Sequence, residues 1–225
     1  MHIIKELIYR RYKISFSKSG EDLLLSKILQ NFKSGTYVDI GCWDPIKASN
    51  SYYFFLRGYK GICIDPNPQL KDRFARYRKS DKLITCGVGL DNSVLDYYMI
   101  KHDGSMNTFD PKFIEENNLQ NSVEKILKIP IRPLGEILRE ECVPKQELLF
   151  FDIDVEGYDL QVLQSNDWDH FKPYAVMVES TLSVKEDMES EINDFLERKG
   201  YKIFAKTVIN KDLGNLIFLR DGFYK

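Results

Sequence analysis

The segment TYVDIGCWDPIKASNSYYFFLRGYKGICID, residues 36–65, decides the fold. It begins and ends with short apolar runs, residues 36–40 and 61–65, and a helix-like stretch lies between them. Similar runs recur at residues 82–88, 148–154 and 175–179. Each run is too short and too apolar for a strand with an exposed face. The alternation therefore predicts βαβ units and a parallel sheet that helices cover on both faces.

The C-terminal residues predict how this sheet ends. A helix is expected over residues 184–199, with Ser183 and Glu186 as a capping box, Met188 on its apolar face and Gly200 as its stop. Two strand-like runs then flank the turn NKDLG and predict an antiparallel hairpin. The whole order indicates an α/β fold with a doubly wound, mostly parallel sheet, in which ligands bind beyond the carboxyl ends of the strands.

Two segments depart from the alternation of strands and helices. Residues 1–34 are predicted to form an N-terminal helical segment, in which residues 3–13 make an amphipathic helix and Ser19 with Asp22 cap a second helix. Packing of the first helix on its own domain is favoured over weak association with a membrane surface. Residues 35–225 are expected to form one unit, and residues 91–131 interrupt it as a lid-like insertion.

Composition excludes several classes of protein. The chain has 225 residues, and 43% hydrophobic with 29% charged residues lie close to globular averages. Lys and Arg number 32 against 34 Asp and Glu, so the basic excess of a dedicated nucleic-acid binder is missing. No apolar stretch is long enough to span a bilayer, and no CxxC pair suggests zinc or a disulfide framework. A cytoplasmic protein without a nucleic-acid partner is expected.

Gly41 and Asp65 indicate a nucleoside ligand. Gly41 follows the first strand, where it permits a sharp turn, and Asp65 ends the second strand 24 residues later. An acid at about this distance is placed to accept hydrogen bonds from a ribose. The turn lacks the GxGxxG spacing that wraps a pyrophosphate, so S-adenosylmethionine fits better than NAD or FAD. The structural alternative is that Asp65 caps the next helix.

An acidic cluster is predicted at the end of the strand over residues 148–154. Asp152, Asp154 and Glu156 would share one side of an extended chain, and Glu179 would end the neighbouring strand. Adjacent carboxylates repel one another, so such a cluster usually manages a proton or a cation. The alternative is that some of these acids cap the following helices.

The sequence resembles the FkbM family of S-adenosylmethionine-dependent methyltransferases. The resemblance rests on YVDIG, a Ser-Asn pair, RGYKGICIDPNP, IDVEGYDLQVL and a strand that ends in Glu, at residues 37–41, 49–50, 57–68, 153–163 and 178–179. It implies the seven-stranded, Rossmann-like class I methyltransferase fold. It also implies which residues form the cofactor site. They are Asp39 and Gly41 in the loop after the first strand, Ser49 and Asn50 near the methionine end, Asp65 at the ribose, Gly87 and Val88 beside the adenine, and Asp152, where many relatives have a less acidic residue.

The implied activity is O-methylation of a sugar hydroxyl in a glycan or glycan precursor. Because a neutral hydroxyl is a poor nucleophile, a base or a metal must take its proton. Asp154, Glu156 and Glu179 suit the base, and Asp154 with Glu179 would hold a divalent metal if one is required. His102, in the polar insertion, is a further candidate for the base.

Two alternative functions stay open. The basic stretch KDRFARYRKSDK, which includes Arg73 and Arg78, motivates an RNA methyltransferase, although a solvated helix face explains it as well. A module that binds a nucleoside without catalysis and serves glycan assembly is the other alternative. The aromatic residues 52–55 could stack on a sugar, but core packing is the favoured interpretation.

Overall fold

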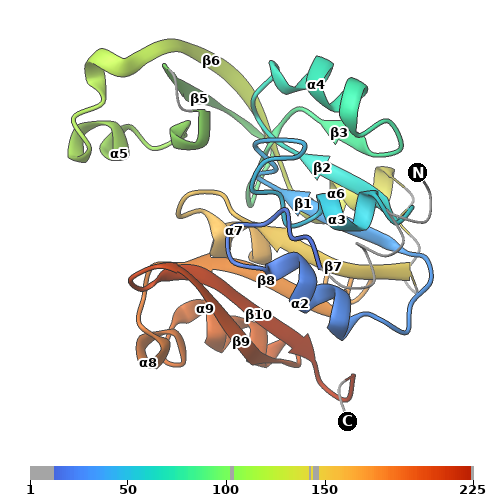
Figure 1. Ribbon diagram of the computed structural model, residues 1–225. Helices are drawn as coiled ribbons and strands as arrows, with labels where there is room; N and C mark the ends of the chain where they lie inside the picture. Colours follow the sequence, from blue (N-terminus) through green and yellow to red (C-terminus); the bar gives the residue numbers. More distant parts are fainter. Residues whose placement is uncertain (1–12, 102–103, 142, 144–146, 224–225) are drawn as a thin grey trace.

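A seven-stranded sheet runs through the middle of the molecule (Figure 1). The computed structural model describes residues 13–101, 104–141, 143 and 147–223. In spatial order the sheet is β3-β2-β1-β7-β8-β10-β9. Its strands are β1 (Thr36–Ile40), β2 (Lys60–Ile64), β3 (Lys82–Ile84), β7 (Leu148–Ile153), β8 (Ala175–Ser180), β9 (Tyr201–Asn210) and β10 (Leu213–Arg220).

Pairing within this sheet confirms the predicted fold class. β1 pairs in parallel with β2 and β7, β2 with β3, and β7 with β8. β10 alone runs antiparallel to its neighbours β8 and β9, so the C-terminal hairpin is confirmed. The order reverses between β1 and β7, and the carboxyl ends of these two strands are where ligands bind in open α/β sheets.

Helices cover both faces of the sheet because its central strands are apolar on both. Tyr37 of β1 and Phe150 of β7 pack toward α2, α3 and α4, whereas Val38 and Phe151 pack toward α6, α7 and α9. The helices are α2 (Glu21–Ile28), α3 (Tyr52–Phe55), α4 (Leu70–Tyr77), α6 (Leu134–Glu140), α7 (Asp159–Gln164), α8 (Val184–Asp187) and α9 (Glu191–Arg198). The two resulting cores confirm the doubly wound arrangement.

A second, three-stranded sheet rises beside the first. It has the order β4-β6-β5 and is formed by β4 (Gly87–Val88), β5 (Ser93–Ile100) and β6 (Val123–Arg132). The β5–β6 hairpin and α5 (Pro111–Glu116) extend away from the main sheet (Figure 1). The predicted insertion, residues 91–131, is therefore built around this hairpin, and its closing over a ligand stays a prediction.

Three local predictions are wrong: the single strand over residues 82–88, the continuous helix over residues 184–199 and the apolar position of Met188. The strand expected over residues 82–88 is split between the two sheets, because β3 pairs with β2, whereas β4 pairs with Ile131 and Arg132 of β6. The helix expected over residues 184–199 is interrupted, because Ser190 starts α9 by accepting a hydrogen bond from Asn193 N–H, and Met188 is 63% exposed. The capping box of Ser183 with Glu186 does exist, at the start of α8.

The predicted capping pair near the N-terminus is also wrong. α2 begins after Gly20, whose φ of 85° is left-handed, and no side chain caps it. Asp22 instead accepts hydrogen bonds from Ser15, Phe16 N–H and Ser17, and so it folds the preceding loop back onto the helix. The amphipathic helix predicted for residues 3–13 falls on the segment that precedes the described residues, apart from Lys13.

No helix in the described part of the chain is long and apolar enough to cross a membrane. Three cysteines of that part, Cys42, Cys63 and Cys86, are buried and free. Cys63 and Cys86 belong to the two core clusters as small apolar residues.

Candidate functional site

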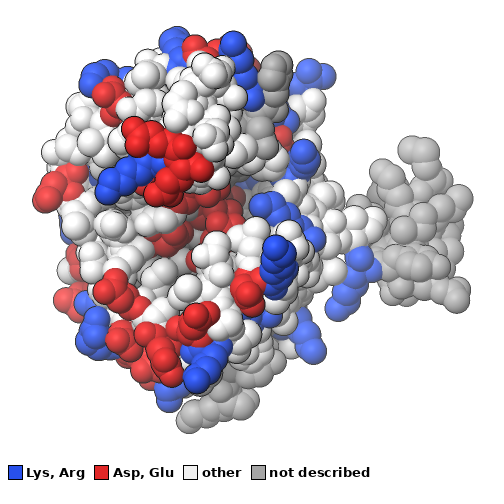
Figure 2. Space-filling view, turned by 90° about the vertical axis from the view of Figure 1, so that its left-hand side faces the viewer, with Lys and Arg blue, Asp and Glu red and all other residues white. Residues whose placement is uncertain are grey.

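A cavity of about 410 Å³ opens at the carboxyl ends of β1, β2 and β7, with the second sheet as one wall. Figure 2 faces this side of the molecule and shows Asp and Glu side chains gathered in the hollow at its centre. Most of the predicted site residues line the cavity. They are Asp39, Gly41, Ser49, Asn50, Asp65, Gly87, Val88, Asp152, Asp154 and Glu156.

Gly41 is required where β1 passes between its two neighbours. Its N–H donates to the Ile64 carbonyl of β2, and the Asp154 N–H donates to the Ile40 carbonyl. Its φ is 85°, and a Cβ added there would lie 1.8 Å from the Asp154 carbonyl oxygen. Only glycine therefore allows the chain to turn here with the end of β7 packed against it.

Asp65 shapes the floor of the cavity. Its two carboxylate oxygens accept hydrogen bonds from Trp43 N–H (2.9 Å) and Asn67 N–H (2.8 Å). Burial raises the pKa of Asp65 to about 6 against these two hydrogen bonds, which lower it. Neither donor belongs to α4, so Asp65 does not cap the next helix. It holds two loops together and still faces the cavity.

Asp39 and Asp152 lie opposite each other on β1 and β7. Ser51 donates a hydrogen bond to Asp39, and Asn50 donates one of 3.3 Å to Asp152. Burial raises the pKa of both carboxyls, and for Asp152 the neighbouring charge of Asp39 raises it further. Of the predicted Ser-Asn pair, Asn50 holds Asp152, whereas Asp39 is held by Ser51 and not by Ser49.

Arg78 is a residue of this site that sequence reasoning misplaced. Its side chain is buried, and its guanidinium donates to Asp81, to the Pro45 carbonyl and to Ser51. It thus holds the loop between β1 and α3 from behind. In the basic stretch that motivated an RNA ligand, Arg78 is therefore buried, and Arg73 is paired with Asp44 at 2.7 Å. A buried arginine cannot be told from an exposed one in a single helical stretch of sequence.

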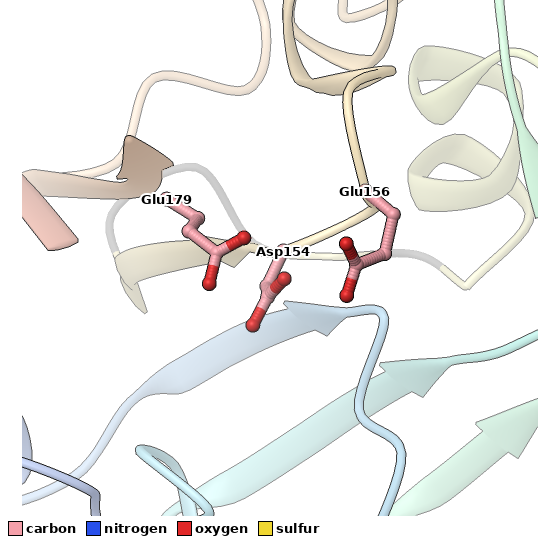
Figure 3. Close-up of side chains that lie close together, drawn as sticks. All are labelled: Asp154, Glu156 and Glu179. Atoms are coloured by element: carbon pink, nitrogen blue, oxygen red, sulfur yellow. The ribbon is translucent and has the colours of Figure 1, made fainter. Parts of the chain in front are cut away.

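Asp154, Glu156 and Glu179 form a compact cluster at the edge of the cavity. One carboxylate oxygen of each lies within 4.8 Å of the others. Figure 3 shows the three side chains turned toward the same space, with Asp154 in the middle. Glu179 comes from β8, and Glu156 reaches the cluster through a left-handed turn (φ 51°) after β7 has ended.

This geometry corrects the expected set. The shared side of an extended strand does not bring Glu156 in, because β7 ends at Ile153 and the turn redirects the chain. Asp152 lines the cavity beside Asp39 and is not a member of the compact cluster. Glu179 is in the cluster, although it is not among the residues that line the cavity.

Electrostatics favour the protonated forms of Asp154 and Glu179 near neutral pH. Burial raises the pKa of Asp154 to about 8, and the negative charge of Glu179 adds to the effect. Burial raises the pKa of Glu179 to about 7, and Glu156 adds to the effect. Lys18, in the loop before α2, lines the cavity and lowers both pKa values. Sequence reasoning missed Lys18 because it lies far along the chain from the strands.

The remaining predictions are tested only in part. His102 lies outside the described residues. The aromatic residues 52–55 pack as expected: Phe54 is in the core, Tyr53 and Phe55 pack against it, and none of the four lines the cavity. No side chain caps α7, so none of the cluster acids caps this helix, and Asp159 instead accepts a hydrogen bond from Val155 N–H.

The cavity fits an S-adenosylmethionine molecule. Its volume lies in the range of small-molecule sites, about 300 to 1,000 Å³. Ile64, Val88 and Phe109 supply an apolar wall for a purine, and Asp65 supplies carboxylate oxygens for a ribose. The acidic lining matches the positive charge of a sulfonium. These residues would hold the cofactor.

Comparisons with known proteins agree with this geometry. The family model described as "Methyltransferase FkbM domain" matches residues 35–203. The comparison with curated proteins found no match. A solved structure of methyltransferase FkbM from Methylobacillus flagellatus is similar with a TM-score of 0.52 and 15% identity, over 83% of this chain and 44% of that one. The chain thus spans less than half the length of that relative.

Other solved methyltransferases resemble the chain more distantly. A putative type 11 methyltransferase from Sulfolobus solfataricus has a TM-score of 0.44 and 13% identity, over 91% of this chain and 94% of that one. The family match covers most of the sequence, and the strand order of the sheet and the cavity at its carboxyl edge are consistent with it. The chain therefore belongs to the FkbM methyltransferase domain family.

Proposed function

We propose that the protein transfers a methyl group from S-adenosylmethionine to a hydroxyl group of a sugar acceptor. The observation that carries the proposal is the Asp154–Glu156–Glu179 cluster at the edge of a cofactor-sized cavity. An ionised carboxylate accepts hydrogen bonds and a protonated carboxyl group also donates one, so a cluster of three suits an acceptor with several neighbouring hydroxyls. A sugar has that chemistry.

The cavity residues divide into two groups by the part of the cofactor they suit. Asp65 would accept hydrogen bonds from the ribose hydroxyls, and the apolar wall of Ile64 and Val88 would pack against the adenine. Asp39 and Asn50, held by the loop behind them, would face the amino-acid end. Binding at these points would fix the donor for an in-line displacement, in which positioning supplies much of the rate.

Asp154 is the residue best suited to take the acceptor's proton. When bound, the cofactor supplies a methyl group on a positively charged sulfur. As the oxygen–carbon bond forms and the carbon–sulfur bond breaks, the hydroxyl proton passes to Asp154 or to Glu179 beside it. A pKa of about 8 makes Asp154 a much stronger base than an ordinary carboxylate and leaves part of it ionised at neutral pH.

A divalent cation is the rival explanation of the cluster. Hard cations take carboxylate oxygens as ligands, and Asp154 with Glu179 would be the ligands here. The cation would then ionise the hydroxyl in place of a base. Turnover that survives dialysis against EDTA supports the base, and turnover that is lost and then restored by Mg²⁺ or Mn²⁺ supports the metal.

Ligand-dependent thermal unfolding tests the cofactor assignment. S-adenosylmethionine or S-adenosylhomocysteine at 100 times its dissociation constant should stabilise the protein by about 2.7 kcal/mol. The absence of stabilisation by either compound would reject the enzyme. An RNA substrate would instead show binding that weakens steeply with salt, because several phosphate contacts release counterions.

Two variants test the role of the cluster. Asp154→Asn and Glu179→Gln should remove turnover and leave the affinity for S-adenosylhomocysteine nearly unchanged. Glu197→Gln, on the exposed side of α9, is the matched control and should keep full turnover. If both cluster variants are fully active, the cluster has no part in the proton transfer. If both lose cofactor affinity as well, their role is in binding.

A further inference from the structure

The charge of the cavity carries an inference about the acceptor. Among the described residues that line it, the only Lys or Arg is Lys18, and six are acidic. The acids are Asp39, Asp65, Asp91, Asp152, Asp154 and Glu156. The hollow at the centre of Figure 2 shows the same excess of acid. The ionised members of this set repel an anion, and a nearby cation would favour loss of the protons that burial keeps on the others.

Phosphate recognition needs groups that the described residues of this cavity do not offer. Arg side chains bind phosphates through paired hydrogen bonds, and Lys does so as a point charge. Lys18 already interacts with Asp154 and Glu179, whose pKa values it lowers. Arg78 lies behind the cavity wall, and its guanidinium is bonded to Asp81 and to the loop that includes Ser51.

Side chains occupy N–H groups at two helix starts beside the cavity. Backbone N–H groups at a helix start can bind a phosphate when they are free. At α5, Asp110 accepts a hydrogen bond of 2.8 Å from Lys112 N–H. At α3, Ser49 accepts one of 3.2 Å from Tyr52 N–H. At α7 no side chain caps the helix, but its first residue is the acidic Asp159, which accepts a hydrogen bond from Val155 N–H.

The acidic surface continues outside the cavity. The turn over residues 156–159 forms part of the cavity wall on one side and part of an open groove on the other. The groove has Leu160, Leu182 and Ile192 among its lining residues, together with Glu186, Glu189 and Glu191. An acceptor larger than one sugar unit would meet further negative charge there.

We propose that the acceptor is a phosphate-free compound, uncharged or cationic, and that nucleotide sugars and RNA are excluded by charge. The inference rests on the proposed function, since it names the acceptor class of that same site. A sugar in a finished glycan without phosphate, or an amino sugar, meets the condition. The cofactor itself fits the same rule, because its sulfonium is a cation.

A charge series on one nucleoside tests the selection without knowledge of the acceptor. The probes are 5′-amino-5′-deoxyadenosine, 5′-deoxyadenosine and adenosine 5′-monophosphate, which differ at one position and carry positive, zero and negative charge. Competition with S-adenosylhomocysteine gives their dissociation constants at 20 mM and 500 mM salt. We expect the monophosphate to bind at least tenfold more weakly than the neutral probe at low salt, with a smaller gap at high salt, because salt screens charge.

A matched pair of variants ties the effect to the cavity. Asp91 is an exposed cavity residue outside the proposed catalytic cluster, and Glu197 is an exposed residue of α9 outside the cavity. Asp91→Lys should reduce the discrimination against the monophosphate several-fold, and Glu197→Lys, with the same change of charge, should leave it unchanged. Equal effects of the two variants, or a gap below tenfold in the natural protein, would overturn the proposal.

Methyl transfer to matched acceptors completes the test. Labelled S-adenosylmethionine is offered with free sugars, amino sugars, phosphate-free oligosaccharides, the corresponding nucleotide sugars and a short RNA. Labelling of phosphate-free compounds alone supports the proposal, and labelling of a nucleotide sugar or of RNA overturns it. If no acceptor is labelled, the nucleoside series decides. If neither S-adenosylhomocysteine nor any nucleoside binds, the proposed function itself has failed.

Discussion

Stability should fall as the pH rises from 5 to 7, because Asp154 and Glu179 of the acid cluster hold protons in the folded state. Asp154 in the folded protein has a pKa of about 8. An unfolded Asp has a pKa of about 3.9, so between these values the folded state binds a proton that the unfolded state has lost. The free energy of unfolding then decreases with pH, and this contribution is lost fully only above pH 8.

The magnitude follows from the number of protons. One proton bound in the folded state and absent from the unfolded state changes the free energy of unfolding by about 1.4 kcal/mol per pH unit. From pH 5 to pH 7, Asp154 alone would therefore account for about 2.8 kcal/mol. The pKa of Glu179, about 7, and those of Asp65 and Asp159, about 6 each, are raised as well and act in the same direction.

Comparison of the natural protein with Asp154→Asn isolates this contribution. Guanidinium unfolding at pH 5, 6, 7 and 8 gives the free energy of unfolding of each protein. The natural protein should lose stability steeply, and the variant should lose about 1.4 kcal/mol less per pH unit between pH 5 and 7. Glu197→Gln, exposed on α9, should follow the natural protein. A flat or rising curve for the natural protein, or equal slopes for Asp154→Asn, would refute the reasoning.

Three further predictions concern the same edge of the sheet. Gly41→Ala should cost more than about 2 kcal/mol, because the added Cβ would lie 1.8 Å from the Asp154 carbonyl oxygen; an unchanged melting temperature would contradict this. Ser51→Ala and Tyr37→Phe each remove one hydrogen bond to Arg78, but only Ser51 also holds a carboxylate of the cavity. Calorimetry should therefore show about tenfold weaker binding of S-adenosylhomocysteine for Ser51→Ala and little change for Tyr37→Phe, and equal affinities would reject this role of the loop. Turnover should rise with pH up to about 8 as Asp154 loses its proton, and a rate that is constant from pH 6 to 9 would argue against it as the base.

The sequence was most informative where local pattern and tertiary position agree. The apolar runs of β1 and β7 predicted strands buried on both faces, and every residue of both strands is buried. The hairpin of β9 and β10 followed from two strand-like runs around a short turn. Gly41 could be predicted because a turn at a strand end calls for a residue that accepts positive φ.

Predictions failed where a long-range contact overrides the local pattern. The run over residues 82–88 reads as one strand, yet Gly87 and Val88 pair with β6, which follows more than 30 residues later. The helix over residues 184–199 is broken at Ser190, because its hydroxyl competes for the N–H of Asn193. Neither event leaves a signal in hydrophobic periodicity.

The site was predicted only in part, because long-range contacts bring some of its residues together. Asp154 directly follows β7 and Glu179 lies near the end of its parallel neighbour β8, so their meeting could be expected from strand order. Glu156 joins them through a left-handed turn, and Lys18 joins from the loop before α2. Arg78 is buried by tertiary packing alone. Its position in a basic helical stretch gave the opposite expectation.

A crystal structure with S-adenosylhomocysteine would test the central claim most directly. The account predicts that the ligand lies in the cavity between the two sheets, with its ribose hydroxyls hydrogen-bonded to Asp65 and its sulfur facing the space in front of Asp154 and Glu179. A ligand bound elsewhere, or one whose sulfur points away from these carboxylates, would contradict it.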